Sequence, residues 1–465
     1  MYTASSTKFS LLTTYLSFLI IFCIGYIKDI ARKILKINKN KSPSILSDLQ
    51  SFYGRTCARR ISDCLNFPVK GRPGRIIHVL NRIQDTPYSL KITKEVKQLI
   101  NFGSYNYLGF GDTPDKLIKK LHKTIDKYPI NIAACYRDIG RHKLIIKLEK
   151  EMASFLHKED CVVFPMGYGT NTSNIPCLLS EGTLVYSDIL NHASIITGLK
   201  MGKAVIKTFK HNDMEDLEKR LIFDISQGQP TTHRSWEKII VIVEGIYSME
   251  GTILKLNELI NLKKKYKFYI FIDEAHSIGA LGQTGRGVCE YHNVDFNDID
   301  ILMGTFTKSF ASMGGYIAAS KSIVDHLRIF SDFSRFGEQM SPVVARQILE
   351  CLKIIKYKKL GLRKLEKLRR NVQLMRNGLK KLNMFVLGDE SSPVIPVIIT
   401  HPAKMCELSR ICREEGIGVV IVGYPGAPIL YGRVRLCMSS SHRKKDIKKT
   451  LEIFKEADKL LGFSL

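Results

Sequence analysis

Apolar runs alternate with amphipathic segments along most of the chain after residue 100. Six short runs are apolar at nearly every position: CVVFPMG, TLVYSDI, AVIKTFK, KIIVIVEG, FYIFIDEAHS and DIDILMGTF. Strands of this kind are typical of a parallel sheet whose two faces are both covered by helices. Because the segments between them have helical periodicity, the pattern predicts an α/β domain with a largely parallel sheet over residues 101–345.

The pattern changes after about residue 345. A long basic helical segment comes first, followed by the strand-like runs MFVLG, PVIPVIIT, GIGVVIV and RVRLCMS and by a closing helix. This order predicts a smaller α+β domain over residues 346–465. Residues 61–100 form a mixed N-terminal extension ahead of the large domain, which opens with NFGSYNYLGFGD.

Residues 1–60 are expected to form a membrane anchor and a basic linker. The 19 residues from Phe9 to Ile27 carry no charge, which is about enough helix to cross a hydrocarbon core of roughly 30 Å. Lysines and arginines follow this run, and only Lys8 precedes it. The positive-inside rule therefore predicts a single-pass helix with the rest of the chain in the cytosol. The alternatives are an interfacial hairpin or a signal peptide, although a signal peptide would carry its positive charge in front.

The formal net charge of +27 over 465 residues would suit nucleic acid or an anionic surface. Much of it lies on amphipathic helices such as residues 353–370, where a solvated helix face is the simpler interpretation. No nucleic-acid-binding motif accompanies the charge, so we expect no nucleic acid partner, while acyl-CoA phosphates or lipid head groups stay open. The eleven cysteines form no CxxC pair, so neither a metal site nor a disulfide framework is indicated.

Polar residues with chemical potential follow the strand-like runs directly. Because parallel strands end at a common edge, such residues collect there. Each one alone would more often be a cap or turn residue, but their recurrence at successive strand ends indicates a site. The residues are Asp188, His192, Glu244, Asp273, His276 and Lys308.

Lys308 is the centre of the chemistry that this edge predicts. A buried lysine amine can attack a carbonyl and form a Schiff base. A pyridine aldehyde would also need a carboxylate at its ring nitrogen, for which Asp273 is the candidate, and a flat ring stacked on it, for which His192 is suitable. A phosphate tail needs helix-start amides and hydroxyls, offered by Gly167, Tyr168, Thr305 and Thr307. These requirements point to pyridoxal 5′-phosphate.

The runs VEGIYSMEGT, FIDEAHSIGALGQTGRG and GTFTKSF, in this order and spacing, resemble the α-oxoamine synthase family of fold-type I pyridoxal-phosphate enzymes. The resemblance extends from about residue 70 to the C-terminus and is greatest to the lysine-bearing subunits of serine palmitoyltransferases. It implies an aspartate-aminotransferase-like fold and the condensation of L-serine with palmitoyl-CoA to 3-ketodihydrosphingosine. It also implies the endoplasmic reticulum membrane as the location and, as the partner, a paralogous subunit that lacks the lysine.

The resemblance assigns a role to each cofactor residue. Lys308 would hold the cofactor and remove the serine α-proton. Asp273 would pair with the pyridinium nitrogen, His276 with the ring 3′-oxygen, and His192 would stack on the ring.

The resemblance also assigns the substrate site. Arg435, in GRVRLCMSSSH, would grip the substrate carboxylate, because a guanidinium binds it with two hydrogen bonds. Arg433 lies two residues away and is the alternative. Tyr105 and Asn106, in GSYNYLGF, match the substrate-access motif, in which related soluble enzymes have asparagine where Tyr105 stands.

Two departures from the family pattern stand out. Glu338 and Gln339 replace a Thr-Ser pair that contacts a neighbouring subunit's phosphate, which favours an unequal partner without cofactor, and Ala311 replaces a glycine. The alternatives are another α-oxoamine synthase (forming 5-aminolevulinate, 8-amino-7-oxononanoate or 2-amino-3-ketobutyrate) or a non-catalytic scaffold subunit. The lysine, aspartate and two histidines together disfavour the scaffold.

Overall fold

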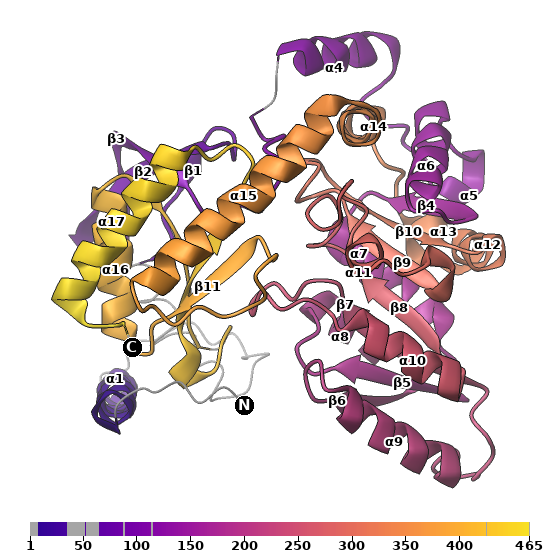
Figure 1. The fold of residues 1–465 in the computed structure, drawn as a ribbon, viewed down its shortest axis with the longest axis horizontal. Coiled ribbons are helices and arrows are strands. Elements are labelled where there is room, and N and C mark those ends of the chain that lie inside the picture. The colour runs from indigo at the N-terminus through magenta and orange to yellow at the C-terminus, as the bar shows by residue number, and fades with distance from the viewer. Residues whose placement is uncertain are drawn as a thin grey trace.

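The structure is a computed structural model that describes residues 8–34, 52, 65–86, 89–112, 115–424 and 426–464. Two bodies lie side by side, and the long helix α15 (Lys359–Lys381) runs from one to the other (Figure 1). Most of the predicted basic linker and the first four residues of the predicted N-terminal extension, together residues 35–51 and 53–64, lie outside the described residues.

The larger body is built on a seven-stranded sheet of order β4-β10-β9-β8-β7-β5-β6. Every strand is parallel to the others except β10, which is antiparallel to both of its neighbours. The strands are β4 (Asp160–Phe164), β5 (Thr183–Asp188), β6 (Val205–Phe209), β7 (Lys238–Glu244), β8 (Tyr269–Asp273), β9 (Ile301–Thr305) and β10 (Gly315–Ala319). The predicted largely parallel sheet is therefore confirmed.

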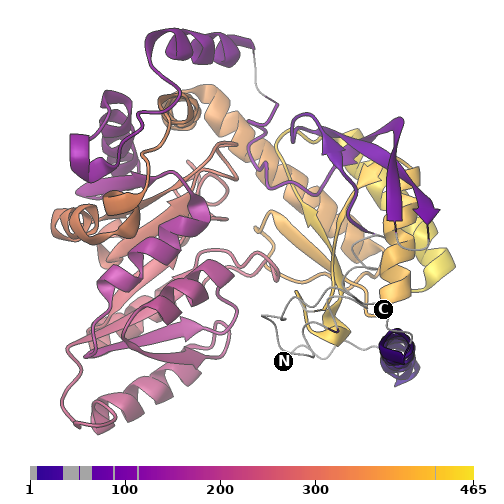
Figure 2. The same cartoon turned by 180° about the vertical axis from the view of Figure 1, so that it is seen from behind.

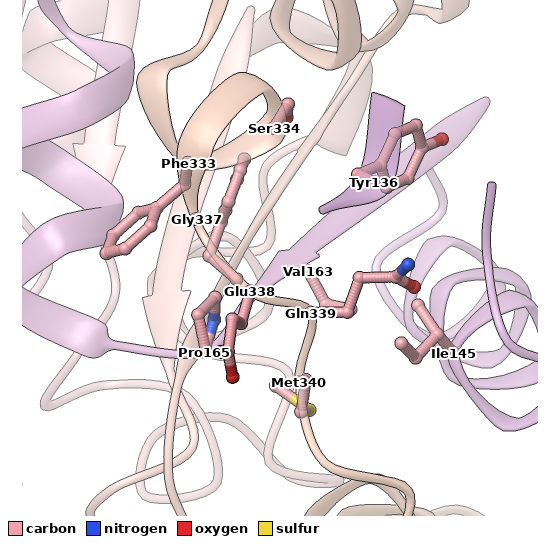
Figure 3. A pocket seen from close by; sticks show the side chains of 11 residues that line it. Tyr136, Ile145, Val163, Pro165, Phe333, Ser334, Gly337, Glu338, Gln339 and Met340 are labelled. Carbon is pink, nitrogen blue, oxygen red and sulfur yellow. The ribbon is translucent and has the colours of Figure 1, made fainter. Parts of the chain in front are cut away.

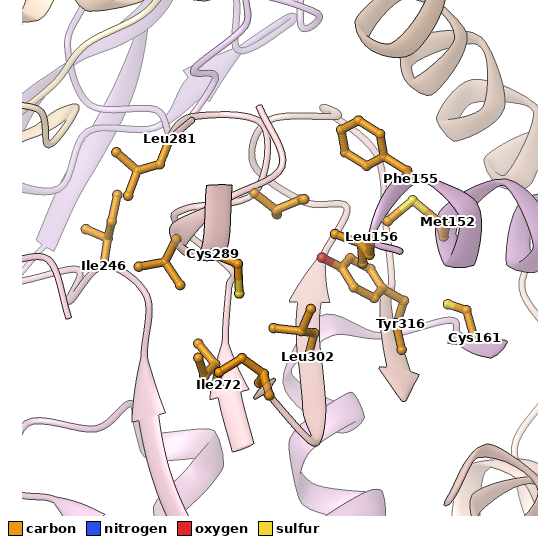
Figure 4. Close-up of a cluster of buried hydrophobic side chains, with 14 of the residues drawn as sticks. Met152, Phe155, Leu156, Cys161, Ile246, Ile272, Leu281, Cys289, Leu302 and Tyr316 are labelled. Atoms are coloured by element: carbon orange, nitrogen blue, oxygen red, sulfur yellow. The ribbon is translucent and has the colours of Figure 1, made fainter. Parts of the chain in front are cut away.

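The continuous apolar runs are explained by burial on both faces of this sheet. Along β8, Ile270 and Ile272 enter one core, while Phe271 enters the core on the opposite face. Figure 4 shows part of the first core, where Ile272 and Leu302 pack among side chains from neighbouring elements.

Helices cover the two faces unequally. The face of the larger core is covered by α6 (Lys143–Phe155), α9 (Met214–Gln227), α10 (Leu256–Tyr266), α11 (Val288–His292) and α14 (Pro342–Tyr357). The other face is covered by α7 (Gly167–Asn174), α8 (Ala193–Met201) and α12 (Lys321–Phe330). The remaining elements of this body are α4 (Asp115–Lys127), α5 (Tyr136–Ile139), α13 (Asp332–Phe336) and the 3-10 turns η2 (Pro176–Leu178) and η3 (Phe296–Asp298).

The smaller body combines C-terminal and N-terminal segments. An antiparallel sheet of β11 (Val394–Ile398), β14 (Arg433–Cys437) and β13 (Val420–Val422) packs against α15, α16 (Pro402–Glu414) and α17 (Lys444–Leu461). Beside it lies a sheet of β1 (Val69–Lys70), β2 (Ile76–Thr86), β3 (Ser89–Asn101) and β12 (Ile417–Gly418), visible from behind in Figure 2. The turn η4 (Ile429–Tyr431) precedes β14.

Two details differ from the predicted elements. The run MFVLG is not a strand; it forms only an isolated bridge between Val386 and Val397. Strand β10 was not predicted, because GYIAA is short and its glycine and alanines have low strand propensity. The domain bounds stay predictions; along α15, Leu365 belongs to the larger body's core and Leu368 to the smaller body's.

The N-terminal helix α1 (Lys8–Ile34) contains a stretch, Leu11–Lys28, that is long and apolar enough to cross a membrane. It lies beside the smaller body (Figure 1), where Thr14 and Phe18 are buried and Ser17 Oγ lies 3.1 Å from His401 Nε2. Its other side exposes large apolar side chains, among them Leu16, Leu19, Ile20 and Ile27. The predicted helix is confirmed, and its passage through a membrane stays a prediction.

Candidate active site

A cavity of about 190 Å³ lies at the carboxyl ends of β7, β8 and β9. Its lining includes every residue predicted to bind the cofactor: Gly167, Tyr168, His192, Asp273, His276, Thr305, Thr307 and Lys308. Parallel strands bring these residues together because their ends share one edge of the sheet. The predicted cofactor-binding residues are therefore assembled in one place, whereas Asp188, also predicted at this edge, does not line the cavity and lies 3.0 Å from His211 Nδ1.

Lys308 follows β9 and is half-buried in this cavity. Within the described part of the chain its amine has neither an ion pair nor a hydrogen bond, and it lies 5.8 Å from the ring centroid of Tyr105. Burial lowers the pKa of Lys308, although the charge of Asp273 acts in the opposite direction. A larger neutral fraction makes the amine a better nucleophile and base.

Asp273, the last residue of β8, is held by two donors. The backbone amide of Ala275 donates to Oδ1 and the side-chain amide of Asn171 donates to Oδ2, both over 2.8 Å. The amide of Asn171 also lies 3.0 Å from Ser194 Oγ. Asn171 was not predicted, although it stands one helical turn beyond Gly167 in GYGTN and so faces the same side of the helix.

The two histidines use one ring nitrogen each within the protein. His192 Nδ1 lies 2.7 Å from Ser194 Oγ, and His276 Nδ1 lies 2.7 Å from Tyr107 Oη. Among the described residues the Nε2 atoms have no partner, so both remain free toward the cavity. Loss of solvation lowers the pKa of His192 and, more strongly, that of buried His276. Neutral rings suit stacking and hydrogen bonding to an oxygen.

The start of α7 supplies the predicted anion cradle. The first amides of a helix have no intrahelical acceptor, and the first two residues of α7, Gly167 and Tyr168, both line the cavity. A Cβ at Gly167 would lie 3.1 Å from Thr305 Cγ2, so a side chain there would crowd the cradle. The hydroxyl of Thr307 lies 3.1 Å from that of Thr305. Together these groups fit a phosphate.

The structure distinguishes the two candidate arginines on β14. Arg433 donates to the backbone oxygens of Met249 (2.8 Å) and Tyr431 (2.9 Å), and it pairs with Glu250 at 3.3 Å. In the described residues Arg435 makes two 3.4 Å contacts, to Ser248 O and Met249 Sδ, and interacts with the Cys437 thiol, while its buried Nε has no partner. Its guanidinium carbon lies 4.7 Å from the ring centroid of Tyr105. Arg435 is therefore the arginine with free hydrogen-bonding capacity.

The two residues of the substrate-access motif, Tyr105 and Asn106, lie in different environments. Tyr105 lies edge-on to His276, with ring centroids 4.8 Å apart; like Arg435, it is close to residues of the cavity but is not one of those that line it. The side chain of buried Asn106 is used within the chain: its amide donates to Pro73 O and its oxygen accepts from Gly111 N. Asn106 thus holds the loop that presents Tyr105, and it does not line the cavity.

Glu338 and Gln339 are likewise engaged within the chain. Glu338 accepts a hydrogen bond from Asn131, and Gln339 donates to Gly140 O over 2.6 Å. Figure 3 shows both beside Tyr136 and Phe333 at a small pocket of about 10 Å³, which has room for about one water molecule. Both positions brace the segment of residues 131–140 against the stretch that leads into α14.

The residues of the cavity fit pyridoxal 5′-phosphate. A free amine, a fixed carboxylate, two neutral imidazoles and a helix-start cradle are the groups that such a cofactor requires. Asn171 Oδ1, in this cavity, is a buried polar atom without a partner in the described residues, as expected where a bound molecule supplies one. Within the described residues no cluster of histidine, cysteine or acidic side chains is arranged to hold a metal ion.

The chain is similar to known proteins over most of its length, and not only at this site. Residues 97–454 match the family of aminotransferases of class I and II. The chain is 42% identical to long chain base biosynthesis protein 2d of Oryza sativa subsp. japonica, over 97% of its own length and 94% of that protein. It is also 42% identical to serine palmitoyltransferase 2 of Saccharomyces cerevisiae, over 97% of its length and 82% of the relative's.

A solved structure is similar over most of the chain as well. The serine palmitoyltransferase of Sphingomonas wittichii superposes on this chain with a TM-score of 0.77 at 26% sequence identity. The match covers 90% of this chain and 100% of the Sphingomonas wittichii chain. The family match over residues 97–454 and the 42% identity to these relatives over 97% of the chain establish that this chain belongs to the class I and II aminotransferase family and, within it, to the subunit 2 group of serine palmitoyltransferases.

Proposed function

We propose that this chain is the cofactor-bearing subunit of a serine palmitoyltransferase. It would bind pyridoxal 5′-phosphate and convert L-serine and palmitoyl-CoA into 3-ketodihydrosphingosine, CoA and carbon dioxide. The observation that carries the proposal is the amine of Lys308, which is free of any ion pair in the described residues and lines one cavity with Asp273 and both histidines. Relatives named serine palmitoyltransferase 2 and long chain base biosynthesis protein 2 support the choice of reaction.

When bound, pyridoxal phosphate draws electrons from the α-carbon of the amino acid and so makes its α-proton acidic. Lys308 then accepts this proton, because its lowered pKa leaves a larger fraction of the amine neutral. Asp273, fixed by Asn171 and Ala275, holds a proton at the pyridine nitrogen at the point where negative charge develops.

The other residues bind and orient. His192 offers its ring as a stacking surface. His276 offers Nε2 to a ring oxygen, while Tyr107 fixes the tautomer and orientation of this histidine. Arg435 receives the serine carboxylate through two parallel hydrogen bonds, and Tyr105 limits the space beside Lys308.

Spectroscopy and product analysis test the proposed reaction. The purified chain should absorb near ~420 nm, as expected for this cofactor bound to a lysine, and Lys308→Ala should lose that band. Asp273→Asn should keep some cofactor but nearly abolish turnover. L-serine should be converted and glycine or alanine should not. A colourless protein would favour the scaffold alternative, and preferred use of glycine or alanine would favour another α-oxoamine synthase.

We further propose a heteromeric, membrane-bound enzyme at the endoplasmic reticulum. An apolar cavity of about 510 Å³ lies beside Met313 and Val344 with exposed Glu338 at its rim, a surface that a paralogous subunit without cofactor would cover. The exposed apolar side of α1 supports a membrane location. Deleting residues 1–34 should release the protein from membranes without removing the absorbing cofactor. A complex of two copies of this chain, measured by mass, would contradict the unequal partner.

A further inference from the structure

Two carboxyl groups meet at the floor of the catalytic cavity. Glu244 ends β7 and Asp273 ends β8, and the two are directly paired in the register of these neighbouring strands. Each is only 4% exposed, and both line the cavity. Two neighbouring buried carboxyl groups resist simultaneous ionisation, so one of them takes up a proton more readily.

The hydrogen bonds distinguish the two carboxyl groups. Asp273 accepts from two nitrogen donors, the side chain of Asn171 and the backbone of Ala275. Glu244 accepts from one donor in the described residues, the backbone amide of His192. Glu244 is therefore the member of the pair that is expected to carry the proton.

The surroundings of Glu244 act in the same direction. Burial raises its pKa well above the ordinary value, the charge of Asp273 raises it next, and the His192 amide and Lys308 oppose them. Asp188 raises the pKa further, and the backbone amide of Glu244 donates to the hydroxyl of Tyr247 over 3.2 Å. The groups that face Glu244 are thus Asp188, His192, Tyr247, Asp273 and Lys308, with Tyr105 at longer range.

The carboxyl group of Glu244 accepts a hydrogen bond from the backbone amide of His192 and so can hold this residue in place. His192 is the N-cap of α8, and its ring nitrogen Nδ1 accepts from the Ser194 amide over 3.2 Å. The hydrogen bond from the His192 amide to Glu244 ties the start of this helix to the end of β7. Since the ring and the amide belong to one residue, fixing the amide also limits where the ring can lie over the cavity.

We propose that Glu244 is a positioning residue that acts as a neutral carboxylic acid and fixes the backbone of His192, and with it the ring that covers the cofactor. The proposal rests on the proposed function, because it assigns the ring of His192 to the cofactor. A neutral group holds the amide without adding a second negative charge beside Asp273, which is required to stay ionised at the pyridine nitrogen.

Three substitutions of Glu244 separate positioning from charge. Glu244→Gln keeps an oxygen acceptor of nearly the same shape and no charge, so pyridoxal phosphate affinity and the visible band should stay close to those of the unsubstituted protein. Glu244→Ala removes the acceptor and should weaken pyridoxal phosphate binding by about tenfold, the effect of one lost hydrogen bond. Glu244→Asp shortens the side chain and should resemble Glu244→Ala. Affinity is measured by titrating the apoprotein with pyridoxal phosphate, without substrate.

Glu149 provides the matched control. It is also buried, at 1% exposed, but it pairs with Arg141 and Arg328, so Glu149→Gln leaves Arg141 without its charge partner in the described residues, while Arg328 keeps Asp160 and Asp325. Glu149→Gln should lower the melting temperature and Glu244→Gln should not. An infrared difference spectrum between the unsubstituted protein and Glu244→Gln should also contain the carbonyl band of a protonated carboxyl group.

The outcomes distinguish this inference from the proposed function. If the unsubstituted protein binds no pyridoxal phosphate, the proposed function itself fails. If it binds the cofactor and Glu244→Gln weakens pyridoxal phosphate binding as much as Glu244→Ala does, the carboxyl group acts through its charge and the inference is wrong. If Glu244→Ala binds the cofactor as tightly as the unsubstituted protein does, Glu244 has no positioning role.

Discussion

Asn171 donates a hydrogen bond to Asp273, with 2.8 Å between its Nδ2 and Oδ2 of the carboxylate. The two residues come from the first helix after β4 and from the end of β8, far apart in the sequence. Both are almost fully buried, at 1% and 4% exposed. The bond matters because it fixes the plane of the carboxylate that is proposed to hold the pyridine nitrogen's proton.

Asn171→Ala should therefore lower turnover while retaining cofactor. One hydrogen bond to a charged group contributes about 1.5–3 kcal/mol, so kcat should fall by roughly 10- to 100-fold. The control is Asn174→Ala on the same helix, since the Asn174 amide donates to Thr170 O and not to Asp273. Steady-state kcat and the visible spectrum are measured for both. Equal kcat losses in the two variants would mean that the effect comes from α7 and not from Asp273.

Arg435→Lys should raise the KM for L-serine and leave the KM for palmitoyl-CoA unchanged. A lysine offers one point charge where the guanidinium offers two parallel donors, so the KM should rise by about tenfold or more. Arg433→Lys should instead lower the melting temperature, because Arg433 is bound to Glu250, Met249 and Tyr431. A rise in the serine KM in Arg433→Lys alone would reverse the assignment of the two arginines.

The polar residues at the carboxyl edge of the large sheet could be predicted because each lies next to its strand in the sequence. Asp273, His276 and Lys308 each follow an apolar strand directly, and parallel pairing necessarily brings strand ends together. Helical spacing from Gly167 places Asn171 on the same side of α7, but its bond to Asp273 also depends on α7 lying against the end of β8, a tertiary relationship that the sequence pattern does not contain.

The hydrogen bonds that Asn106, Glu338 and Gln339 make within the chain also could not be predicted from the sequence. Each side chain bonds to a segment that the chain brings close only on folding, such as Pro73 for Asn106 and Gly140 for Gln339. The strand β10 was missed for a related reason. Its five residues are held by ladders on both sides, which override a weak local propensity.

The free energy of unfolding should fall as the pH is lowered from about 6.5 to about 4, in part because of His442. Burial lowers the pKa of His442 to about 4, whereas in the unfolded chain it is ordinary, near ~6.5. The stabilising contribution is thus complete above the unfolded-state pKa and is lost as the pH falls toward the folded-state value. The loss amounts to about 3 kcal/mol by the lower end of this range.

Substitution of His442 tests this pH dependence. The neutral ring accepts from Ser439 N at 3.1 Å and donates to Asn101 O at 2.9 Å, so protonation would break the first bond. His442→Gln should be less stable near neutral pH but should lose less stability on acidification in chemical denaturation. Exposed His122→Gln on α4 is the control and should leave the slope unchanged. An unchanged slope in His442→Gln would exclude His442 as the titrating group.

Ala311→Gly should raise the melting temperature. Ala311 has φ +47°, in the left-handed region, and its amide donates to Lys308 O over 3.1 Å. An alanine there costs about 1–2 kcal/mol, and glycine removes that strain while adding about 0.4–1 kcal/mol of unfolded-state entropy. The net gain is about 1 kcal/mol or less. Its sign is the test, and the control Ala345→Gly within α14 should lower the melting temperature, since glycine costs about 1 kcal/mol in a helix.

Ala311→Val should act in the opposite direction, because a β-branched residue fits the left-handed region worse than alanine does. The loop that contains Ala311 also contains Lys308, and it is closed by the bond from Ser312 N to Phe306 O at 2.9 Å. Since both ends of the loop are held, the backbone must shift at Lys308 to relieve the added strain. Both the melting temperature and the visible absorbance should therefore fall. If Ala311→Gly and Ala311→Val melt at the same temperature as the unsubstituted protein, the backbone at this position is not strained.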